Sequence, residues 1–163
     1  MHPAVREARE SDVEQILRLI VELADYERSA DSVRVNAGQL RTALFGAQPS
    51  AYALVAEADG TVVGFALYFL NFSTWEGVPG IYLEDLFVRP EHRSAGLGLA
   101  LMRALAEIAV QRGYARFEWS VLDWNEPSIA FYRRLGALPM DGWTVYRLSG
   151  DALRSAATGS DAV

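Results

Sequence analysis

The sequence contains no cysteine among its 163 residues. Disulfide bonds, thiolate zinc sites and a cysteine nucleophile are therefore excluded, which removes several classes of enzyme. Histidine is also scarce, because only His2 and His92 are present. Two histidines are too few for most metal clusters, so we expect no bound metal.

The sequence also lacks a run of about 18 uncharged apolar residues, the length that a membrane-spanning helix needs. The stretch from Met1 to Glu14 carries charges where a secretory signal needs an apolar segment. Acidic residues outnumber basic ones, and the net charge of -6 argues against binding to a nucleic-acid backbone. We expect a soluble, cytoplasmic protein without membrane or nucleic-acid partners.

The composition, with 51% hydrophobic and 22% charged residues, suits one domain over residues 1–163 with a poorly ordered tail from about residue 150. The order of the predicted strands and helices indicates an α/β layered fold, in which a central mixed, twisted sheet of six to seven strands is flanked by about four helices. Apolar periodicity and turn residues predict strand 4–9, a helix from 11, helix 39–45, strands 51–57, 61–71 and 81–88, helix 96–112, strand 115–122, helix 125–136 and strand 144–148.

A glycine-rich turn follows the strongly apolar strand 81–88. Gly96 and Gly98 open the next helix, and Arg93 precedes them. A helix N-terminus of this kind binds anions through its free N–H groups and its dipole. The turn lacks the Gly-Lys-Ser/Thr ending of an ATP-binding loop, and Leu101 stands where a dinucleotide motif needs glycine or alanine. The turn therefore indicates a phosphate site outside these two classes, or else glycines that serve helix packing alone.

The pattern Arg93-x-x-Gly96-x-Gly98 resembles the acetyl-CoA pyrophosphate motif of the GNAT superfamily of N-acetyltransferases. Segments 22–27, 63–68, 82–88 and 124–132 are similar to the branch of diamine (spermidine/spermine) and thialysine acetyltransferases. The resemblance implies a GNAT fold and a homodimer. It also implies transfer of acetyl from the co-substrate acetyl-CoA to a primary amine of a small cationic acceptor. Because no cysteine is available to carry the acetyl group, we expect direct attack in a ternary complex.

The resemblance places cofactor contacts on the strand end, the glycine turn and the helix that begins near residue 125. The residues are Leu86, Phe87, Val88, Arg93, Ser94, Ala95, Gly96, Leu97, Gly98, Leu99, Asn125, Glu126, Pro127 and Ser128. Asn125 and Ser128 also suit the capping of that helix, a role compatible with ligand contact.

Two residues are candidates for proton transfer. Glu84 lies within an apolar strand, where desolvation would raise the pKa of a carboxylate, and strand alternation directs Asp85 to the opposite face. The resemblance also assigns amine contact to Glu84, whose alternative is an edge-exposed structural carboxylate. Tyr132 matches the family's general acid for the CoA thiolate, with an ordinary core aromatic as the alternative.

The amine site implied by the resemblance is formed by Tyr26, Glu27, Trp75, Glu84 and Asp141. Thr74 and Leu135 depart from the polyamine enzymes, so diamines and lysine analogues such as thialysine both remain open as acceptors. A fold by itself does not establish function, and a non-catalytic acyl-CoA sensor is the alternative from another class.

Overall fold

The computed structural model describes residues 2–159. Its chain divides into two compact units, the first ending at Ser120 and the second beginning at Val121. One domain over residues 1–163 stays a prediction.

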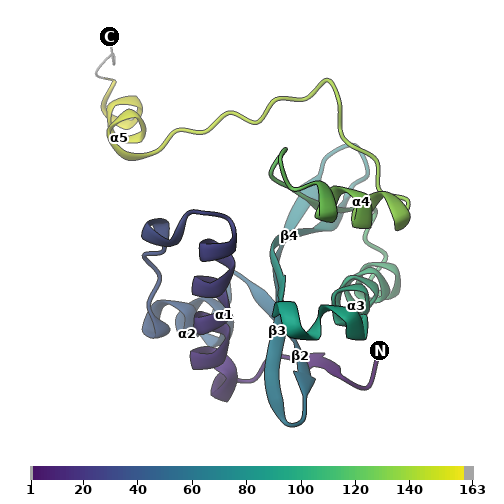
Figure 1. The fold of residues 1–163 in the computed structure, drawn as a ribbon. Coiled ribbons are helices and arrows are strands. Elements are labelled where there is room, and N and C mark those ends of the chain that lie inside the picture. Colours follow the sequence, from purple (N-terminus) through teal and green to yellow (C-terminus); the bar gives the residue numbers. More distant parts are fainter. Residues whose placement is uncertain (1, 160–163) are drawn as a thin grey trace. The chain divides into compact units, whose positions relative to one another are not determined.

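The first unit is built on a five-stranded mixed sheet, which confirms the predicted α/β class (Figure 1). Neighbouring strands follow chain order, antiparallel from the first to the fourth and parallel between the fourth and the fifth. Branched and aromatic side chains suit these pleated, half-buried positions. The strands are β1 (Val5–Glu7), β2 (Tyr52–Ala58), β3 (Thr61–Ser73), β4 (Val78–Val88) and β5 (Phe117–Trp119).

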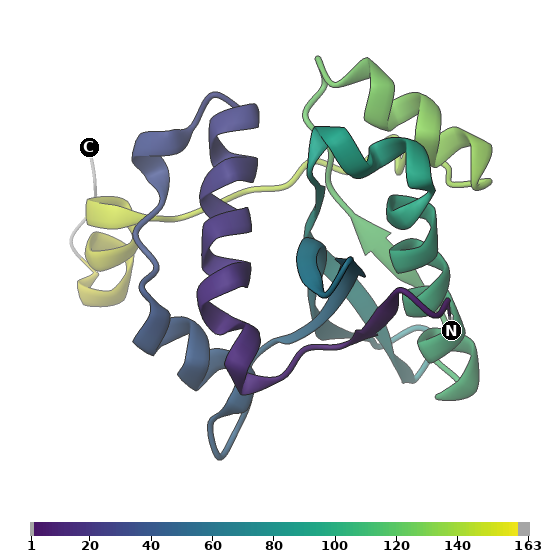
Figure 2. The same ribbon diagram turned by 60° about the horizontal axis from the view of Figure 1, so that its bottom comes forward.

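Helices cover both faces of this sheet. α1 (Val13–Tyr26) and α2 (Ala37–Phe45) lie on one face, and α3 (Leu97–Gln111) lies on the other (Figures 1 and 2). Ile16, Leu19 and Phe65 are fully buried in the core beneath α1 and α2. Within residues 2–159, no helix is long and apolar enough to cross a membrane.

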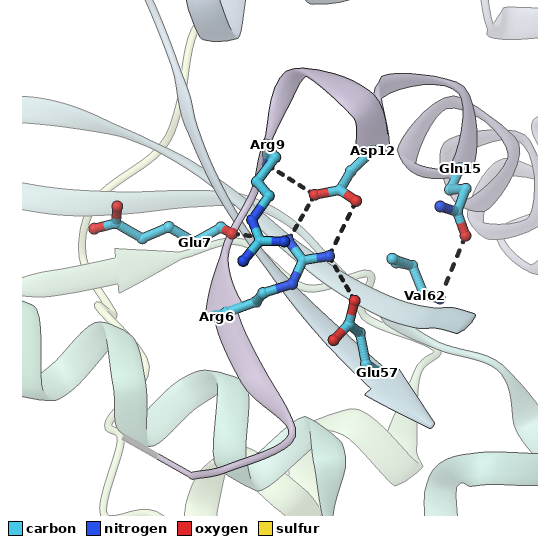
Figure 3. A network of polar contacts seen from close by, with 7 residues as sticks. All are labelled: Arg6, Glu7, Arg9, Asp12, Gln15, Glu57 and Val62. Atoms are coloured by element: carbon cyan, nitrogen blue, oxygen red, sulfur yellow. Dashed lines mark hydrogen bonds and ion pairs between the residues drawn. The ribbon is translucent and has the colours of Figure 1, made fainter. Parts of the chain in front are cut away.

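A buried ionic network joins β1, the start of α1 and β2 (Figure 3). The guanidinium of Arg6 donates two hydrogen bonds to the Asp12 carboxylate, at 2.7 and 3.1 Å, and one to Glu57 at 2.5 Å. Asp12, which is 3% exposed, also accepts the N–H of Arg9 at 2.7 Å. The hydrogen bond from Arg6 is the main reason why the pKa of Asp12 lies below its usual value.

Replacing Arg6 with alanine is expected to lower the free energy of unfolding by about 2 kcal/mol, because Asp12 keeps its buried charge without the partner. The pKa of Asp12 is lowered by folding, so its stabilisation is present above the usual pKa near 4 and is lost as the pH falls through the folded value. Urea unfolding of the wild type, Arg6→Ala and the exposed-site control Arg18→Ala tests this. An Arg6→Ala loss that stays constant down to pH 3 would contradict the assignment.

The second unit contains the helices α4 (Glu126–Arg134) and α5 (Gly150–Thr158). The prediction of a strand over residues 144–148 was wrong. The described sheet has five strands and not six to seven. A strand needs a partner for its N–H and C=O groups, and in residues 2–159 none pairs with this segment. Its apolar side chains stay in solvent, with Val145 86% and Tyr146 92% exposed.

Helix α5 lies where the sequence analysis expected a tail, and it is the fifth α-helix of the described residues rather than one of about four. An ion pair between Arg154 and Asp151 supports its first turn. Gly159 ends it with a left-handed backbone, at a φ of 67°. These local contacts stabilise a short helix in a polar segment. The rest of the predicted tail, 160–163, lies outside the described residues.

Candidate functional site

The N-terminus of α3 forms a turn with open space over its two glycines. Gly96 has a left-handed backbone, with a φ of 73°, between the 3-10 helix η3 (Pro90–Ala95) and α3. A Cβ added at Gly96 or Gly98 would meet no heavy atom of the described residues within 4 Å. No side chain in that part of the chain caps α3, so the N–H groups of its first turn are available. This geometry suits an anion such as a pyrophosphate.

Arg93 adds a positive charge beside this turn. Its Nε donates a hydrogen bond of 2.9 Å to the carbonyl oxygen of Val88 at the end of β4. Its guanidinium lies over two aromatic rings, 4.9 Å from the centroid of Tyr26 and 5.7 Å from that of Phe87. The predicted cofactor residues 86–88 and 93–99 therefore come together at the end of β4 and the start of α3.

A β-bulge lies in β4 at Glu84. Leu67 of β3 pairs with Asp85, and the next residue, Tyr68, pairs with Leu83, so Glu84 has no partner in β3. A bulge breaks the alternation of side chains and redirects them, and bulges are frequent beside active sites. The strand alternation that was expected to direct Glu84 and Asp85 to opposite faces is therefore interrupted here.

The bulge is also the point where β4 and β5 part. β5 pairs with β4 only from Ile81 to Leu83. From Asp85 to Val88, β4 pairs with β3 along one edge, and no strand of residues 2–159 pairs with the other edge. This edge includes Leu86, Phe87 and Val88, and its backbone groups can bind an extended ligand as an added strand would.

Asp85, not Glu84, is the more buried carboxylate of the pair, and its side chain is partly exposed. Glu84 is exposed, which corrects the expectation that it would be desolvated. Burial, together with the negative charges of Glu84 and Glu27, raises the pKa of Asp85 to about 6. Burial also raises the pKa of Glu27. Two carboxylates within electrostatic range of Asp85, those of Glu84 and Glu27, form with it a site that favours a cation.

The end of α1 brings two predicted amine-site residues to this region. Tyr26 is the last residue of α1 and contacts Arg93, and Glu27 follows it within range of Asp85. The cofactor turn and the acidic cluster are therefore next to each other in the first unit.

Two other predicted amine-site residues lie away from this cluster along the chain. Trp75 is 87% exposed in the turn between β3 and β4. From Val78 to Glu84 the strand rises roughly 20 Å, so Trp75 of the same chain does not join the carboxylates. Asp141 is exposed in the second unit.

Helix α4 carries the predicted residues of the second unit. The side chain of Asn125, which is 6% exposed, caps the helix by accepting the N–H of Ser128 at 3.4 Å, and Glu126 and Pro127 form the first turn. Asn125, Ser128 and Tyr132 are spaced by three and four residues, which places them along one face of α4. The predicted cap is confirmed, and the acid candidate shares its face with the two cofactor candidates.

Sequence reasoning missed two features of the site. One is the partial burial of Asp85, which follows from the bulge at Glu84. The bulge arises from pairing between distant residues, so the local sequence gives no sign of it. The other is the ion pair of Arg89 with Glu22, where Nε and Nη2 donate to the carboxylate at 2.9 and 2.7 Å. Among residues 2–159, no three His, Cys, Asp or Glu side chains gather as metal ligands, and the absence of a metal stays a prediction.

Comparison with protein families finds one model that matches residues 12–137, the acetyltransferase (GNAT) family. Among curated proteins, the chain is 42% identical to a thialysine N-epsilon-acetyltransferase of Bos taurus, over 94% of this chain and 96% of the relative. It is 33% identical to a human spermidine/spermine N(1)-acetyltransferase-like protein 1, over 91% of this chain and 23% of that longer protein.

Among solved structures, the chain is similar to an integron cassette protein from the mobile metagenome of V. cholerae. The TM-score is 0.79, with 25% sequence identity, and the match covers 94% of this chain and 96% of the other. This similarity extends to nearly the whole of both chains.

Proposed function

Since the chain belongs to the acetyltransferase (GNAT) family and is an acetyltransferase, we propose that it transfers acetyl from acetyl-CoA to a primary amine of a small cationic acceptor. The observation that carries this proposal is the juxtaposition, in one unit, of an open anion site at the start of α3 and a cluster of carboxylates beside it, of which Asp85 and Glu27 are partly buried. The first suits the CoA pyrophosphate and the second suits an ammonium group. The 42% identity to a curated enzyme favours this activity over a non-catalytic sensor.

On the cofactor side, the N–H groups of the first turn of α3 and the Arg93 guanidinium bind the pyrophosphate. The pantetheine arm extends along the free edge of β4, where Leu86, Phe87 and Val88 supply backbone partners. The family resemblance also assigns contact with this arm to Asn125 and Ser128. One N–H of β4 polarises the thioester carbonyl, and a donor of this kind lowers the barrier by about 3 to 4 kcal/mol.

On the amine side, Glu84, Glu27 and Asp85 attract the ammonium form of the acceptor. The ammonium must lose a proton before its nitrogen can attack. The pKa of Asp85, about 6, is closer to that of an alkylamine than the usual carboxylate value is, and the carboxylate is still ionised at pH 7. We therefore assign proton acceptance to Asp85 and amine binding to Glu84.

The amine nitrogen then forms a bond to the thioester carbon and loses its second proton to solvent, and the carbon–sulfur bond breaks with the electron pair leaving on sulfur. Tyr132 donates its phenolic proton to the thiolate, so that CoA leaves as a thiol. No step requires an acetylated enzyme, in agreement with the lack of cysteine. Tyr132 regains its proton from solvent.

The acceptor that we favour is thialysine or a similar lysine analogue, with diamines as the second class. The match to the thialysine enzyme covers nearly the full length of both proteins, whereas the spermidine/spermine-like relative is matched over 23% of its length. A lysine analogue also carries a carboxylate, for which Arg41, Arg133 and Arg134 are cationic candidates. Arg41 already pairs with Glu10 at 3.2 Å, which leaves the two arginines of α4 as the better candidates.

The active form that we propose is a homodimer in which the exposed turn of one subunit completes the amine site of the other. Trp75 is 87% exposed, and Trp143 and Val145 are 72% and 86% exposed in an extended segment. Several large apolar side chains that are exposed to solvent indicate a surface that binds another protein chain. Sedimentation at micromolar concentration is expected to give the mass of two chains.

A panel of amines tests the activity. Release of free thiol from acetyl-CoA is measured with thialysine, lysine, diamines of increasing length and an aminoglycoside. We expect turnover with thialysine and weaker turnover with diamines. Binding of CoA without amine-dependent thiol release for any of these would refute the proposed function.

A further inference from the structure

The guanidinium of Arg93 is held by groups from two different elements. Nε donates to the Val88 carbonyl of β4, and the guanidinium carbon lies over the ring of Tyr26 from α1 as well as that of Phe87. Arg93 is exposed, and an exposed arginine with free torsions loses rotamer entropy when it binds an anion. The stacking restricts those torsions before any ligand arrives.

The ends of this arginine remain available. Among the described residues, neither Nη atom of Arg93 donates a hydrogen bond. A guanidinium that is anchored through Nε and lies over an aromatic ring still has its two Nη groups, which can pair with two phosphate oxygens. The contacts of Arg93 therefore orient its guanidinium for an anion before the anion binds.

A second contact fixes α1 against the same segment. Glu22 lies one helical turn before Tyr26, and it accepts two hydrogen bonds from Arg89, which lies four residues before Arg93. The hydrogen bond to Glu22 is also the main reason why the pKa of Arg89 is raised. Because α1 meets the segment after β4 at two successive points, the ring of Tyr26 has a defined place over Arg93.

We propose that Tyr26 is a positioning residue for the CoA pyrophosphate, and that it acts through Arg93. The inference rests on the proposed function, since it takes the pyrophosphate to bind beside Arg93. It gives Tyr26 a role on the cofactor side in addition to its place next to the amine site. The part of Tyr26 that matters here is its aromatic face, not its hydroxyl group.

The test compares Tyr26→Leu, which removes the ring, with Tyr26→Phe, which keeps it. The Kd of CoA is measured by calorimetry without any amine, so that an effect on the acceptor does not contribute. Tyr26→Leu is expected to bind CoA about two- to five-fold more weakly, the range of an exposed cation–π contact. Tyr26→Phe is expected to bind CoA as the wild type does.

A double-mutant cycle separates action through Arg93 from a general effect on the fold. In the Arg93→Ala background, Tyr26→Leu is expected to change the Kd of CoA by less than about 1.5-fold, because the partner is already gone. Tyr26→Met provides a second ring-free variant should leucine impair folding. Equal CoA affinity of the ring-free and wild-type proteins, or an equal loss in both backgrounds, would overturn the inference. Failure of the wild type itself to bind CoA would refute the proposed function instead.

Discussion

Replacing Asp85 with asparagine is expected to lower kcat/KM for the amine about 100- to 1000-fold, which is the usual contribution of a positioned base. The acceptor arrives as an ammonium ion, and asparagine cannot take its proton. In the wild type, kcat/KM is expected to fall on the acidic side of about pH 6, because Asp85 is protonated there. A pH profile of thiol release from pH 5 to 9 measures this, and the limb near pH 6 is expected to be absent from the variant.

The same substitution is expected to increase stability, which separates lost chemistry from lost folding. The pKa of Asp85 is raised in the folded state, so the folded protein binds more protons between about pH 4 and 6 and becomes less stable as the pH rises through that range. At pH 7 the buried charge costs about 1 to 2 kcal/mol after allowance for solvent screening, a cost that asparagine removes. Urea unfolding at pH 7 is the measurement.

Glu84→Gln is the matched control, because it neutralises the neighbouring carboxylate, which is exposed. We expect a loss in kcat/KM of less than about ten-fold, mostly through a higher KM, since a surface charge attracts the ammonium only weakly. A large fall in kcat for Glu84→Gln together with a mild effect of Asp85→Asn would return the role of base to Glu84.

Replacing Tyr132 with phenylalanine is expected to lower kcat about 100-fold while the Kd of CoA changes less than two-fold. The ring is kept, so its tilted contact with Phe131, at 5.4 Å between centroids, remains possible. Only the proton for the departing thiolate is lost. Steady-state thiol release and CoA calorimetry on the same preparation give the two values.

Tyr52→Phe provides the comparison for this substitution, because it also removes a phenolic hydroxyl, from a tyrosine of β2 that stacks on Tyr68. It is expected to keep wild-type kcat. If Tyr132→Phe had the kcat of this control, Tyr132 would not be the acid. If it weakened CoA binding and kcat equally, its role would lie in binding.

Local features of the chain were predictable from the sequence. Gly96 adopts the left-handed backbone that a turn before a helix needs, and Asn125 caps α4 as its position before Glu-Pro-Ser indicated. Each depends on residues three or four positions away, so the printed order of residues contains the information. The α/β class followed in the same way from apolar periods.

Features that depend on distant pairing were not predictable. The bulge at Glu84 arises from the register between β3 and β4, and a shift of one residue there changes which carboxylate is buried. In the segment 144–148 the sequence predicted a feature that the fold lacks. Its apolar residues predict a strand, but no described strand pairs with it. A periodic pattern of apolar residues indicates that a segment is suited to pairing as a strand. It does not indicate whether a partner strand lies beside that segment.

The sequence by itself predicted an anion site at Arg93 to Gly98, and it determined an acidic pair within an apolar strand and a capped helix that carries Tyr132. Only the tertiary structure decided that Asp85 is the carboxylate with the raised pKa and that Arg93 lies over Tyr26 of α1. The physical reason is that burial and charge proximity depend on all the elements packed around a group. These elements are β3, β4 and α1, which are far apart in the chain and meet only in the fold.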